Sequence, residues 1–405
     1  LKYCADEYSV FFEEGYKVSA LICFFIISTS YLISYFGKGQ TYMAVLSAAQ
    51  EKYVYSLIFN GVKLLCDILI VVVTIKFKTL ESIAIVILAM KILEEIINRI
   101  VVKKKYPELH EIARKDTSMV KMTKDLAWTQ LGYLILNNVD ALLLMGFNGP
   151  VMVSIYTTYN YILRFLTEIA SRVELSSVYS FGNVFAKKEE KRVYPLFKEY
   201  MMMFILIAFS MCLTFMIGIR GFVSVWVGKE NYILDYITVV LFTSTSFLNI
   251  LYFPLVALIN ADGLFKDNKK HIFICASVNL ILSIILINYL GINGILLGTG
   301  VAFLVNIALK SNLISKKITK EIKLSNILKY YIITIILFIV LSVALKPIEN
   351  YFLLTAGGFI TTILKLGIIF IIITLLTSLI LYVVSNDAKN LFRRLLNLIK
   401  RKLKK

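Results

Sequence analysis

Polar side chains interrupt an apolar stretch that runs from Tyr133 to Pro150, YLILNNVDALLLMGFNGP. They are Asn137, Asn138 and Asp140. In a helix that ends near Phe147, the carboxylate of Asp140 would lie about 10 Å below that end, at 1.5 Å per residue. Asn137 precedes Asp140 by three residues and shares its helix face, whereas Asn138 does not. The stretch therefore places a carboxylate and an amide together inside an apolar layer.

Two further polar residues, Ser283 and Thr299, lie at the depth of Asp140 in two later apolar stretches. Ser283 lies seven residues before one stretch ends, Asn279 is one turn deeper on the same face, and Thr299 lies six residues into the next stretch. One carboxylate with amide, hydroxyl and carbonyl oxygens suits a small hard cation, or a carboxyl group that takes up a proton. The alternative is that Asp140 only bonds Asn279 and holds two helices together.

The elements that would position these residues follow from the composition. The chain has 405 residues, of which 59% are hydrophobic and 17% charged, whereas soluble domains are about 45 to 50% apolar. Strands are unsuited to lipid here, because the stretches lack the alternation of a membrane barrel. We expect an all-α, multi-pass membrane protein with about eleven helices that each cross roughly 30 Å of hydrocarbon. The stretches lie at 17–36, 53–76, 80–101, 126–147, 151–171, 200–219, 233–259, 271–290, 293–312, 328–345 and 356–384.

The net charge of +18 is confined to alternate connections, which argues against nucleic acid as a partner. Basic residues fill the connections at 103–124, 187–192, 266–270 and 316–323 and the C-terminal tail, while the intervening connections hold few lysines or arginines. By the positive-inside rule, the basic connections are cytoplasmic. We expect a bacterial cell (inner) membrane protein whose C-terminus is cytoplasmic.

The long basic connection also suggests how the chain is divided. We expect a partial N-terminal lobe of about three helices at 1–102, a cytoplasmic interlobe loop at 103–124 and a six-helix C-terminal lobe at 125–313. Two additional helices at 314–385 precede a basic tail at 386–405. The tail separates leucines from basic residues, as in an interfacial helix attracted to anionic lipid, the alternative being a solvated tail. The chain opens at Leu1 without Met, so we expect an N-terminal part to be missing.

Ionisable residues form stripes on three apolar stretches, at spacings of three, four or seven residues that share a helix face. A lysine near mid-membrane costs at least roughly 2.5 to 3.5 kcal/mol unless it meets water or a partner. The stripes therefore line a water-filled cavity or form ion pairs that hold helices together. They are Asn60, Lys63 and Asp67; Lys91, Glu94, Glu95, Asn98 and Arg99; and Asn160, Arg164, Glu168 and Arg172.

Signatures of catalysis are missing from the sequence. It contains no GxSxG, HExxH or Walker motif, and its cysteines and histidines lack the spacing of a metal site. The outer connections are about a dozen residues or shorter, whereas a membrane polymerase or ligase would usually expose a larger catalytic loop. We expect no enzyme and no firmly bound metal or cofactor.

Three segments resemble the polysaccharide flippases of the multidrug, oligosaccharidyl-lipid and polysaccharide exporter superfamily. The strongest is NADGLFKDNKKHIFICASVNLILSIILINYLGINGILLGTGVAFLVN, from Asn260 to Asn306. The others are NVDALLLMGFNGPVMVSIYTTYNYI, from Asn138 to Ile162, and YMAVLSAAQEKYV, from Tyr42 to Val54. Together they cover 85 of the 405 residues.

The resemblance implies a fold and a function. Family members have two pseudo-symmetric six-helix lobes around a central groove, and they move a lipid-linked saccharide by alternating access. Here the first lobe would be incomplete. A polyprenyl-pyrophosphate-linked oligosaccharide would place its pyrophosphate and sugars in the groove and its tail in membrane lipid. The implied substrate-binding residues are Lys63, Lys91 and Arg164 for phosphate and Tyr156, Tyr159 and Asn160 for sugars.

The resemblance also implies ion coupling. Some relatives that move peptidoglycan precursors bind sodium through residues that correspond to Asp140, Asn279, Ser283 and Thr299. Ser283 replaces a second Asp of that set and leaves one formal negative charge. A sodium ion, a proton or no ion therefore remain as alternatives for this site, with Asn137 beside it.

Other functions stay open at this point. A drug exporter of the same superfamily would pair a cationic cargo with acidic groove residues, whereas Lys63, Lys91 and Arg164 favour an anionic one. A peptidoglycan precursor flippase is a second alternative, a membrane glycan polymerase or ligase a weak third, and an inactive truncated copy a fourth. Expected partners of a repeat-unit flippase are the glycosyltransferases and polymerase of its pathway.

Overall fold

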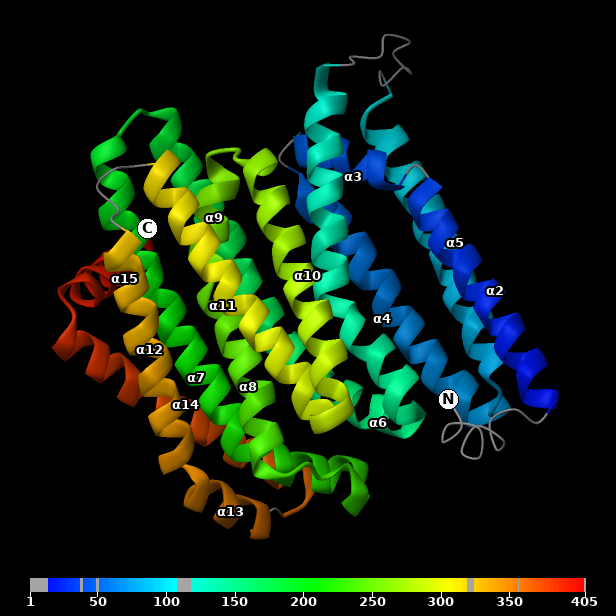
Figure 1. The fold of residues 1–405 in the computed structure, drawn as a ribbon. Helices are drawn as coiled ribbons and strands as arrows, with labels where there is room; N and C mark the ends of the chain where they lie inside the picture. Colours follow the sequence, from blue (N-terminus) through cyan, green and yellow to red (C-terminus); the bar gives the residue numbers. More distant parts are fainter. Residues whose placement is uncertain are drawn as a thin grey trace. The chain divides into compact units, whose positions relative to one another are not determined.

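The computed structural model describes residues 14–36, 39–48, 51–107, 118–318, 324–355 and 357–403. Every regular element in these ranges is a helix, which confirms the all-α prediction (Figure 1). The chain forms two compact units, unit 1 at residues 1–115 and unit 2 at 116–405. The division falls inside the basic connection expected at 103–124.

Within the described residues, eight helices are long and apolar enough to cross a membrane, so the chain has the character of a multi-pass membrane protein. The predicted number of about eleven is not confirmed. Two expected spans, at 126–147 and 151–171, both lie within α6 (Ser118–Ala186), which consists of two helical halves that meet at the non-helical residue Gly149. Two others, at 17–36 and 80–101, form helices α2 (Glu14–Phe36) and α5 (Leu80–Lys105), which are not among the eight.

In the described part of unit 1, three helices pack around a fourth, α5. They are α2, α3 (Gly39–Ala48), α4 (Lys52–Phe77) and α5. Glu51 joins the beginning of α4 to the end of α5, because its carboxylate accepts hydrogen bonds from Lys105 at 2.8 Å and from Tyr106 at 2.6 Å. The bond from Lys105, followed by the bond from Tyr106, lowers the pKa of Glu51 below its ordinary value.

In unit 2, α6 reverses direction at Gly149. This residue has φ 80° and ψ 176°, a conformation that glycine adopts readily, and Pro150 starts the second half with a fixed φ. Two hydrogen bonds join the halves, one from Tyr156 to Asp140 and one from Arg164 to Asn138. The residues farther before the turn thus pair with residues farther after it. The two halves are therefore antiparallel, and the reversal expected at Phe147–Pro150 is present.

The remaining helices of unit 2 surround a core that α7 (Val193–Val227) contributes to most heavily, with twenty buried residues. α10 packs against α11 and α6, and α14 packs against α7. After α7 follow α8 (Tyr236–Leu251), α9 (Phe253–Ala261), α10 (Phe265–Leu290), α11 (Ile292–Lys317), α12 (Leu324–Ala344), α13 (Lys346–Leu354), α14 (Phe359–Val384) and α15 (Asn386–Leu403), with the short 3-10 helices η1 (Glu190–Arg192) and η2 (Glu230–Tyr232) before α7 and α8.

Two glycines bring α10 and α11 into close contact. A Cβ atom on Gly294 would lie 2.4 Å from the carbonyl oxygen of Leu286, and one on Gly298 would lie 2.6 Å from Oγ of Ser283. Any larger side chain would force the helices apart, so the GxxxG spacing serves backbone approach, as expected for a membrane helix pair. This contact positions Ser283 and the preceding turn of α10 opposite Thr299 of α11.

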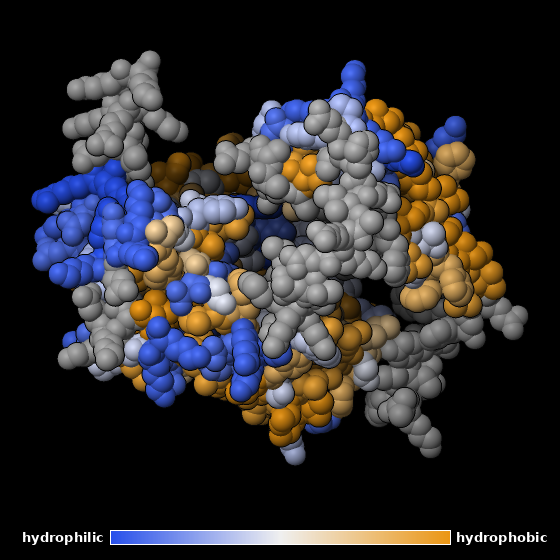
Figure 2. All heavy atoms as spheres, turned by 90° about the horizontal axis from the view of Figure 1, so that it is seen from above, coloured by the Kyte–Doolittle hydropathy of each residue, from blue (hydrophilic) through white to orange (hydrophobic). Residues whose placement is uncertain are grey.

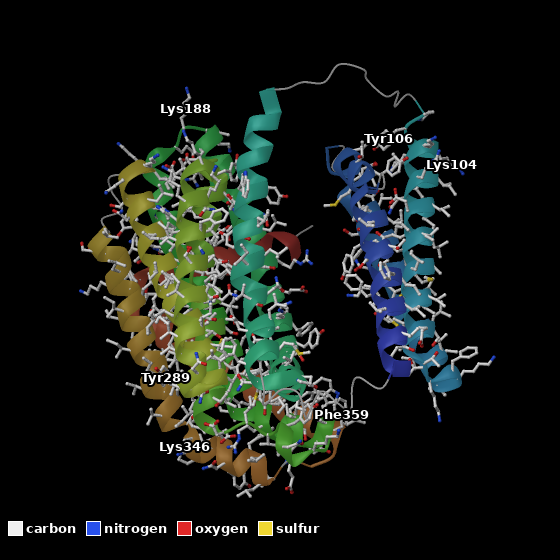
Figure 3. All side chains as sticks on the ribbon, turned by 45° about the vertical axis from the view of Figure 1, so that its right-hand side comes forward. Lys104, Tyr106, Lys188, Tyr289, Lys346 and Phe359 are labelled. Atoms are coloured by element: carbon white, nitrogen blue, oxygen red, sulfur yellow. The ribbon has the colours of Figure 1, made fainter. Side chains whose placement is uncertain are left out.

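The two ends of unit 2 differ in the residues that they carry. Lys188 lies at one end, whereas Tyr289, Lys346 and Phe359 lie at the other (Figure 3). Viewed toward the Lys188 end, hydrophilic residues gather on the surface and hydrophobic residues follow the sides (Figure 2). The orientation inferred from the charge pattern stays a prediction.

Candidate functional site

A cavity of about 370 Å³ lies within unit 2, between both halves of α6 and the helices α8, α9 and α11. We call it the α6 cavity. Its polar lining comes from Asn138, Asp140, Asn160, Arg164 and Glu168 of α6, together with hydroxyls and an amide of the neighbouring helices. Aromatic and aliphatic side chains complete the wall. Asn160, Arg164 and Glu168 of the predicted stripe therefore line a cavity, and the prediction that water fills it stays a prediction.

Asp140 is the most buried carboxylate of the cavity, with 4% of its surface exposed. Its Oδ2 accepts hydrogen bonds from Thr299 at 3.0 Å and from Tyr156 at 3.1 Å. Asn279 in turn donates to the Thr299 hydroxyl at 2.8 Å. The structure thus brings together Asp140, Asn279 and Thr299 in one hydrogen-bonded chain that links α6, α11 and α10.

Two oxygens of this cluster have no hydrogen-bond partner within the described part of the chain. They are Oδ1 of Asn279 and Oγ of Ser283, and both residues are fully buried. A buried acceptor without a partner is costly, by about 1 to 3 kcal/mol. Helix-to-helix bonding alone leaves these two oxygens unexplained, whereas a bound cation or a proton-carrying group would use such acceptors. The side chain of Asn137 lies outside the described residues.

Another part of the cavity wall contains Arg164, Asn160 and Glu168. The guanidinium of Arg164 donates to Oδ1 of Asn138 at 3.2 Å, across the turn of α6. Because Asn160, Arg164 and Glu168 are spaced by four residues, they share the cavity face of α6. The predicted ladder of ion pairs is not formed between Glu168 and Arg172, which form no ion pair with each other or with other described residues.

The contribution of α8 to the cavity was not predicted from the sequence. Thr245, Ser246 and Asn249 of this helix face the α6 cavity beside Phe242. The signal was present as the run TSTSFLN within an expected span, at residues 243–249. Polar residues without charge carry a weak signal, because serine and threonine can bond their own helix, as Thr245 does with the carbonyl of Phe242.

Tyr159 has a structural position and does not line the cavity, contrary to the expected role in sugar binding. It is fully buried. Its hydroxyl donates to the carbonyl of Tyr232 and accepts from the backbone N–H of Leu234, both at 3.1 Å. It therefore holds the connection between α7 and α8 against α6. Tyr156 does line the cavity, but its hydroxyl is used by Asp140.

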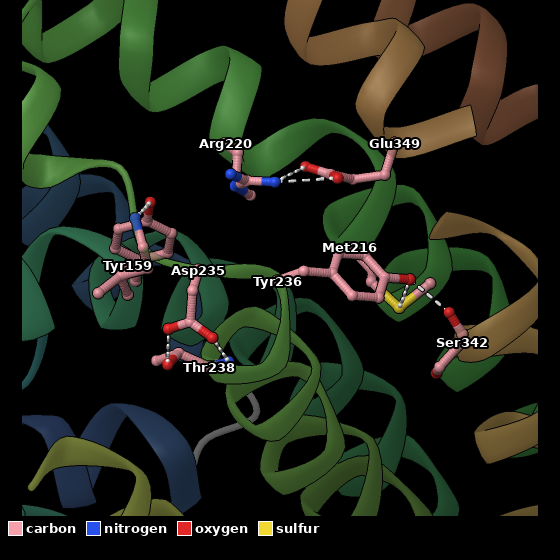
Figure 4. Close-up of polar contacts among 9 residues, drawn as sticks. Tyr159, Met216, Arg220, Asp235, Tyr236, Thr238, Ser342 and Glu349 are labelled. Carbon is pink, nitrogen blue, oxygen red and sulfur yellow. Dashed lines mark hydrogen bonds and ion pairs between the residues drawn. The ribbon is translucent and has the colours of Figure 1, made fainter. Parts of the chain in front are cut away.

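A polar network closes the same end of unit 2 (Figure 4). Arg220 of α7 donates to both carboxylate oxygens of Glu349 on α13, at 3.2 and 3.1 Å. Tyr236, at the start of α8, donates to the carbonyl of Ser342 on α12. Asp235 caps α8 by accepting from Thr238. The network was not predicted from the sequence, because two of its contacts join residues more than a hundred positions apart, Arg220 with Glu349 and Tyr236 with Ser342.

The predicted site residues of the first stripes belong to unit 1. Lys63 and Asp67 are exposed side chains of α4. Lys91 forms an ion pair with Glu94 at 2.8 Å and lies over the ring of Phe59. The expected partners Glu95 and Arg99 do not pair with each other among the described residues. The grouping of Lys63 and Lys91 with Arg164 stays a prediction, because Arg164 belongs to unit 2.

A buried lysine was also missed. Lys310 of α11 has no exposed surface. Its ammonium donates to Oδ1 of Asn268, lies 3.4 Å from the hydroxyl of Tyr133 and faces that ring. Within the described residues, no carboxylate forms an ion pair with it, although buried charges are usually paired.

The described residues contain no group of three or more His, Cys, Asp or Glu side chains that could hold a metal ion.

Comparison with protein-family models and with curated proteins finds no match to this chain.

Proposed function

We propose that the protein is a transporter that moves an anionic, lipid-linked oligosaccharide from the cytoplasmic to the outer leaflet by alternating access. In this proposal α2, α4 and α5 of unit 1 belong to the first lobe, and α6 to α11 of unit 2 form the second lobe. The cargo would be a polyprenyl-pyrophosphate-linked glycan in a bacterial cell membrane, supplied by glycosyltransferases and taken up by a polymerase. The C-terminus would be cytoplasmic.

One observation carries the proposal: the α6 cavity combines a guanidinium with amides and hydroxyls inside an apolar bundle. Arg164 offers charge-assisted hydrogen bonds of the kind that phosphate oxygens accept. Asn160 and Asn249 offer amides, which both donate to and accept from sugar hydroxyls. The aromatic wall of Phe242 and Tyr252 provides flat apolar faces beside them. The three resembling segments support the same function.

A second candidate is an exporter of cationic compounds. Two carboxylates, Asp140 and Glu168, line the α6 cavity with the single guanidinium of Arg164 among its lining residues. This charge pattern favours a cation more than the sequence suggested, because Lys63 and Lys91 belong to the other unit. Cargo tests must therefore include a lipophilic cation.

The first experiment compares cargo classes. Vesicles with the reconstituted chain should bring a pyrophosphate-linked saccharide lipid to the outer leaflet faster than protein-free vesicles, while a neutral glycolipid of equal chain length moves at the background rate. Outer-leaflet appearance is measured by lectin binding. Equal rates for the charged and neutral lipids would contradict the phosphate role, and accumulation of a fluorescent lipophilic cation instead would favour the exporter.

The second experiment concerns coupling at Asp140. We propose that this carboxylate, with Asn279, Ser283 and Thr299, takes a sodium ion or a proton during the cycle. Asp140→Asn removes the charge but keeps the shape and the hydrogen bonds from Thr299 and Tyr156. We expect flux in the variant to lose its response to imposed sodium and pH gradients, whereas the wild type responds to one of them. An unchanged gradient response in Asp140→Asn would leave Asp140 a purely structural role.

A further inference from the structure

A second region of unit 2, distant in sequence from Asp140, has the character of a binding site. A cavity of about 450 Å³ lies between the second half of α6, the start of α7 and the C-terminal helix α15. We call it the α15 pocket. Its wall combines Arg172 and Arg394 with the apolar side chains of Val173, Met203 and Leu391. A neighbouring cavity of about 220 Å³ shares Arg394 with it and extends toward the α6–α7 connection.

The charges around these two cavities are unequal. The lining includes four basic residues, which are Arg172, Lys187, Arg192 and Arg394, and two carboxylates, which are Glu189 and Glu199. Arg192 pairs with Glu189 at 2.5 Å and Arg394 pairs with Glu199 at 3.0 Å. Arg172 and Lys187 form no ion pair with other described residues. The region therefore has two positive charges in excess, which suits an anion.

The depth of the pocket identifies which anion fits it. Arg172 follows Pro150 by 22 residues, so its Cα lies about 33 Å along the second half of α6. A hydrocarbon core is roughly 30 Å thick, which places the guanidinium at the level of lipid headgroups. Val173, Met203 and Leu391 adjoin it with apolar surface. Free phosphate would use only the charges, whereas a phospholipid would use both parts of the wall.

The walls of the pocket are fixed by contacts on all three helices. Lys198 of α7 pairs with Asp387 of α15 at 2.9 Å, and Ala388 and Leu391 of α15 are buried against the bundle. Tyr200 of α7 donates to Oγ of Ser180 on α6 at 2.7 Å. Leu391, one of the leucines of the basic tail, is buried against protein. The pocket is thus a built cavity, distinct from a basic tail that floats on a membrane surface.

We propose that the α15 pocket binds the phosphate of an anionic phospholipid headgroup from the leaflet on the Lys188 side. The guanidinium groups of Arg172 and Arg394 hold the phosphate oxygens, and the acyl chains leave along Val173 and Met203. Such charge-assisted bonds are directional and strong for guanidinium. This inference does not depend on the cargo proposed above.

The test uses the full chain in detergent with equal amounts of phosphatidylglycerol and phosphatidylcholine of matched acyl length, and native mass spectrometry counts the lipids retained. We expect phosphatidylglycerol to be retained in preference. Arg172→Gln and Arg394→Gln should each reduce its retention about tenfold, the size of one lost charge-assisted bond. Arg393→Gln is the matched control, because it removes the same charge one residue away on an exposed side chain and should change little.

Each of four results would overturn the inference. Equal retention of the two lipids would exclude headgroup selection, and an equal loss in Arg393→Gln would indicate a diffuse basic surface. Displacement of phosphatidylglycerol by inorganic phosphate would assign the pocket to free anions.

Because Arg394→Gln also breaks the pair with Glu199, thermal unfolding without lipid is measured in parallel. Arg394→Lys provides a variant that keeps this pair while losing the second guanidinium nitrogen. Reduced selectivity in Arg394→Lys at unchanged unfolding temperature supports the inference, and full selectivity contradicts it.

Discussion

Replacing Arg164 with glutamine is expected to lower the transport rate of a pyrophosphate-linked saccharide lipid by about 10- to 100-fold, because a hydrogen bond to a charged group contributes about 1.5 to 3 kcal/mol. Glutamine keeps a donor for Asn138 but loses the charge that would meet phosphate in the α6 cavity. The measurement is the initial rate of lectin-accessible cargo in reconstituted vesicles, normalised to the amount of inserted protein.

The controls separate charge at this position from charge in general. Arg164→Lys retains the charge without the planar fork and should give an intermediate rate. Arg393→Gln removes one positive charge outside the α6 cavity and should transport normally. A normal rate in Arg164→Gln would withdraw this residue from phosphate binding. Faster uptake of a lipophilic cation in Arg164→Gln would support the exporter, since the carboxylates Asp140 and Glu168 would then dominate the cavity.

Replacing Glu349 with alanine is expected to destabilise unit 2 by about 3 to 5 kcal/mol, because it leaves a largely buried guanidinium without its carboxylate. The Arg220 side chain is 17% exposed and the Glu349 side chain is fully buried. In the double variant Arg220→Met with Glu349→Leu, the loss should be much smaller, since no charge is left buried. Unfolding in a graded denaturing detergent measures both. Equal losses in the single and double variants would show that the ion pair itself is strongly stabilising.

The same pair predicts how stability changes with pH. Burial raises the pKa of Glu349 above its ordinary value of 4.5, and the nearby Arg220 offsets this only in part. A raised pKa in the folded state means that the protonated form is favoured on folding, so this contribution is present at low pH and is lost as the pH rises above 4.5. Glu349→Gln should flatten that part of the profile. An unchanged profile in this variant would assign the pH dependence to other groups.

The sequence predicted the helices far better than the contacts between them. Apolar length identified the spans, and Gly149 with Pro150 marked a reversal, because both signals are local. The same two residues predicted two separate spans here, and the chain is helical on both sides of the kink at Gly149. The basic connections could be identified for the same reason, because the lysines and arginines of a loop are counted without knowledge of its tertiary contacts.

The site was predicted in part, according to how strongly each residue depends on partners that are distant in sequence. Counting residues from the helix ends put Ser283 and Thr299 level with Asp140 and put Asn279 one turn deeper. In the structure Thr299 bonds both Asp140 and Asn279. Counting could not distinguish Tyr156 from Tyr159, because the two tyrosines differ only in the side of the helix on which they lie. Tyr156 lines the cavity, whereas Tyr159 bonds the α7–α8 connection. Nor could counting identify Lys310, whose burial depends on three helices packing around a single side chain.

The environment of Lys310 has an electrostatic consequence for the neighbouring space. Its acceptors are neutral, so the positive potential of the ammonium is not cancelled at short range. Phe303, which lines the α6 cavity, precedes it by seven residues on the same face of α11, about 10 Å away along the axis. A low-dielectric surrounding screens this potential weakly. Negative solutes near Phe303 would be attracted and positive ones repelled. This preference comes from a fixed charge, so it is present without an ion gradient.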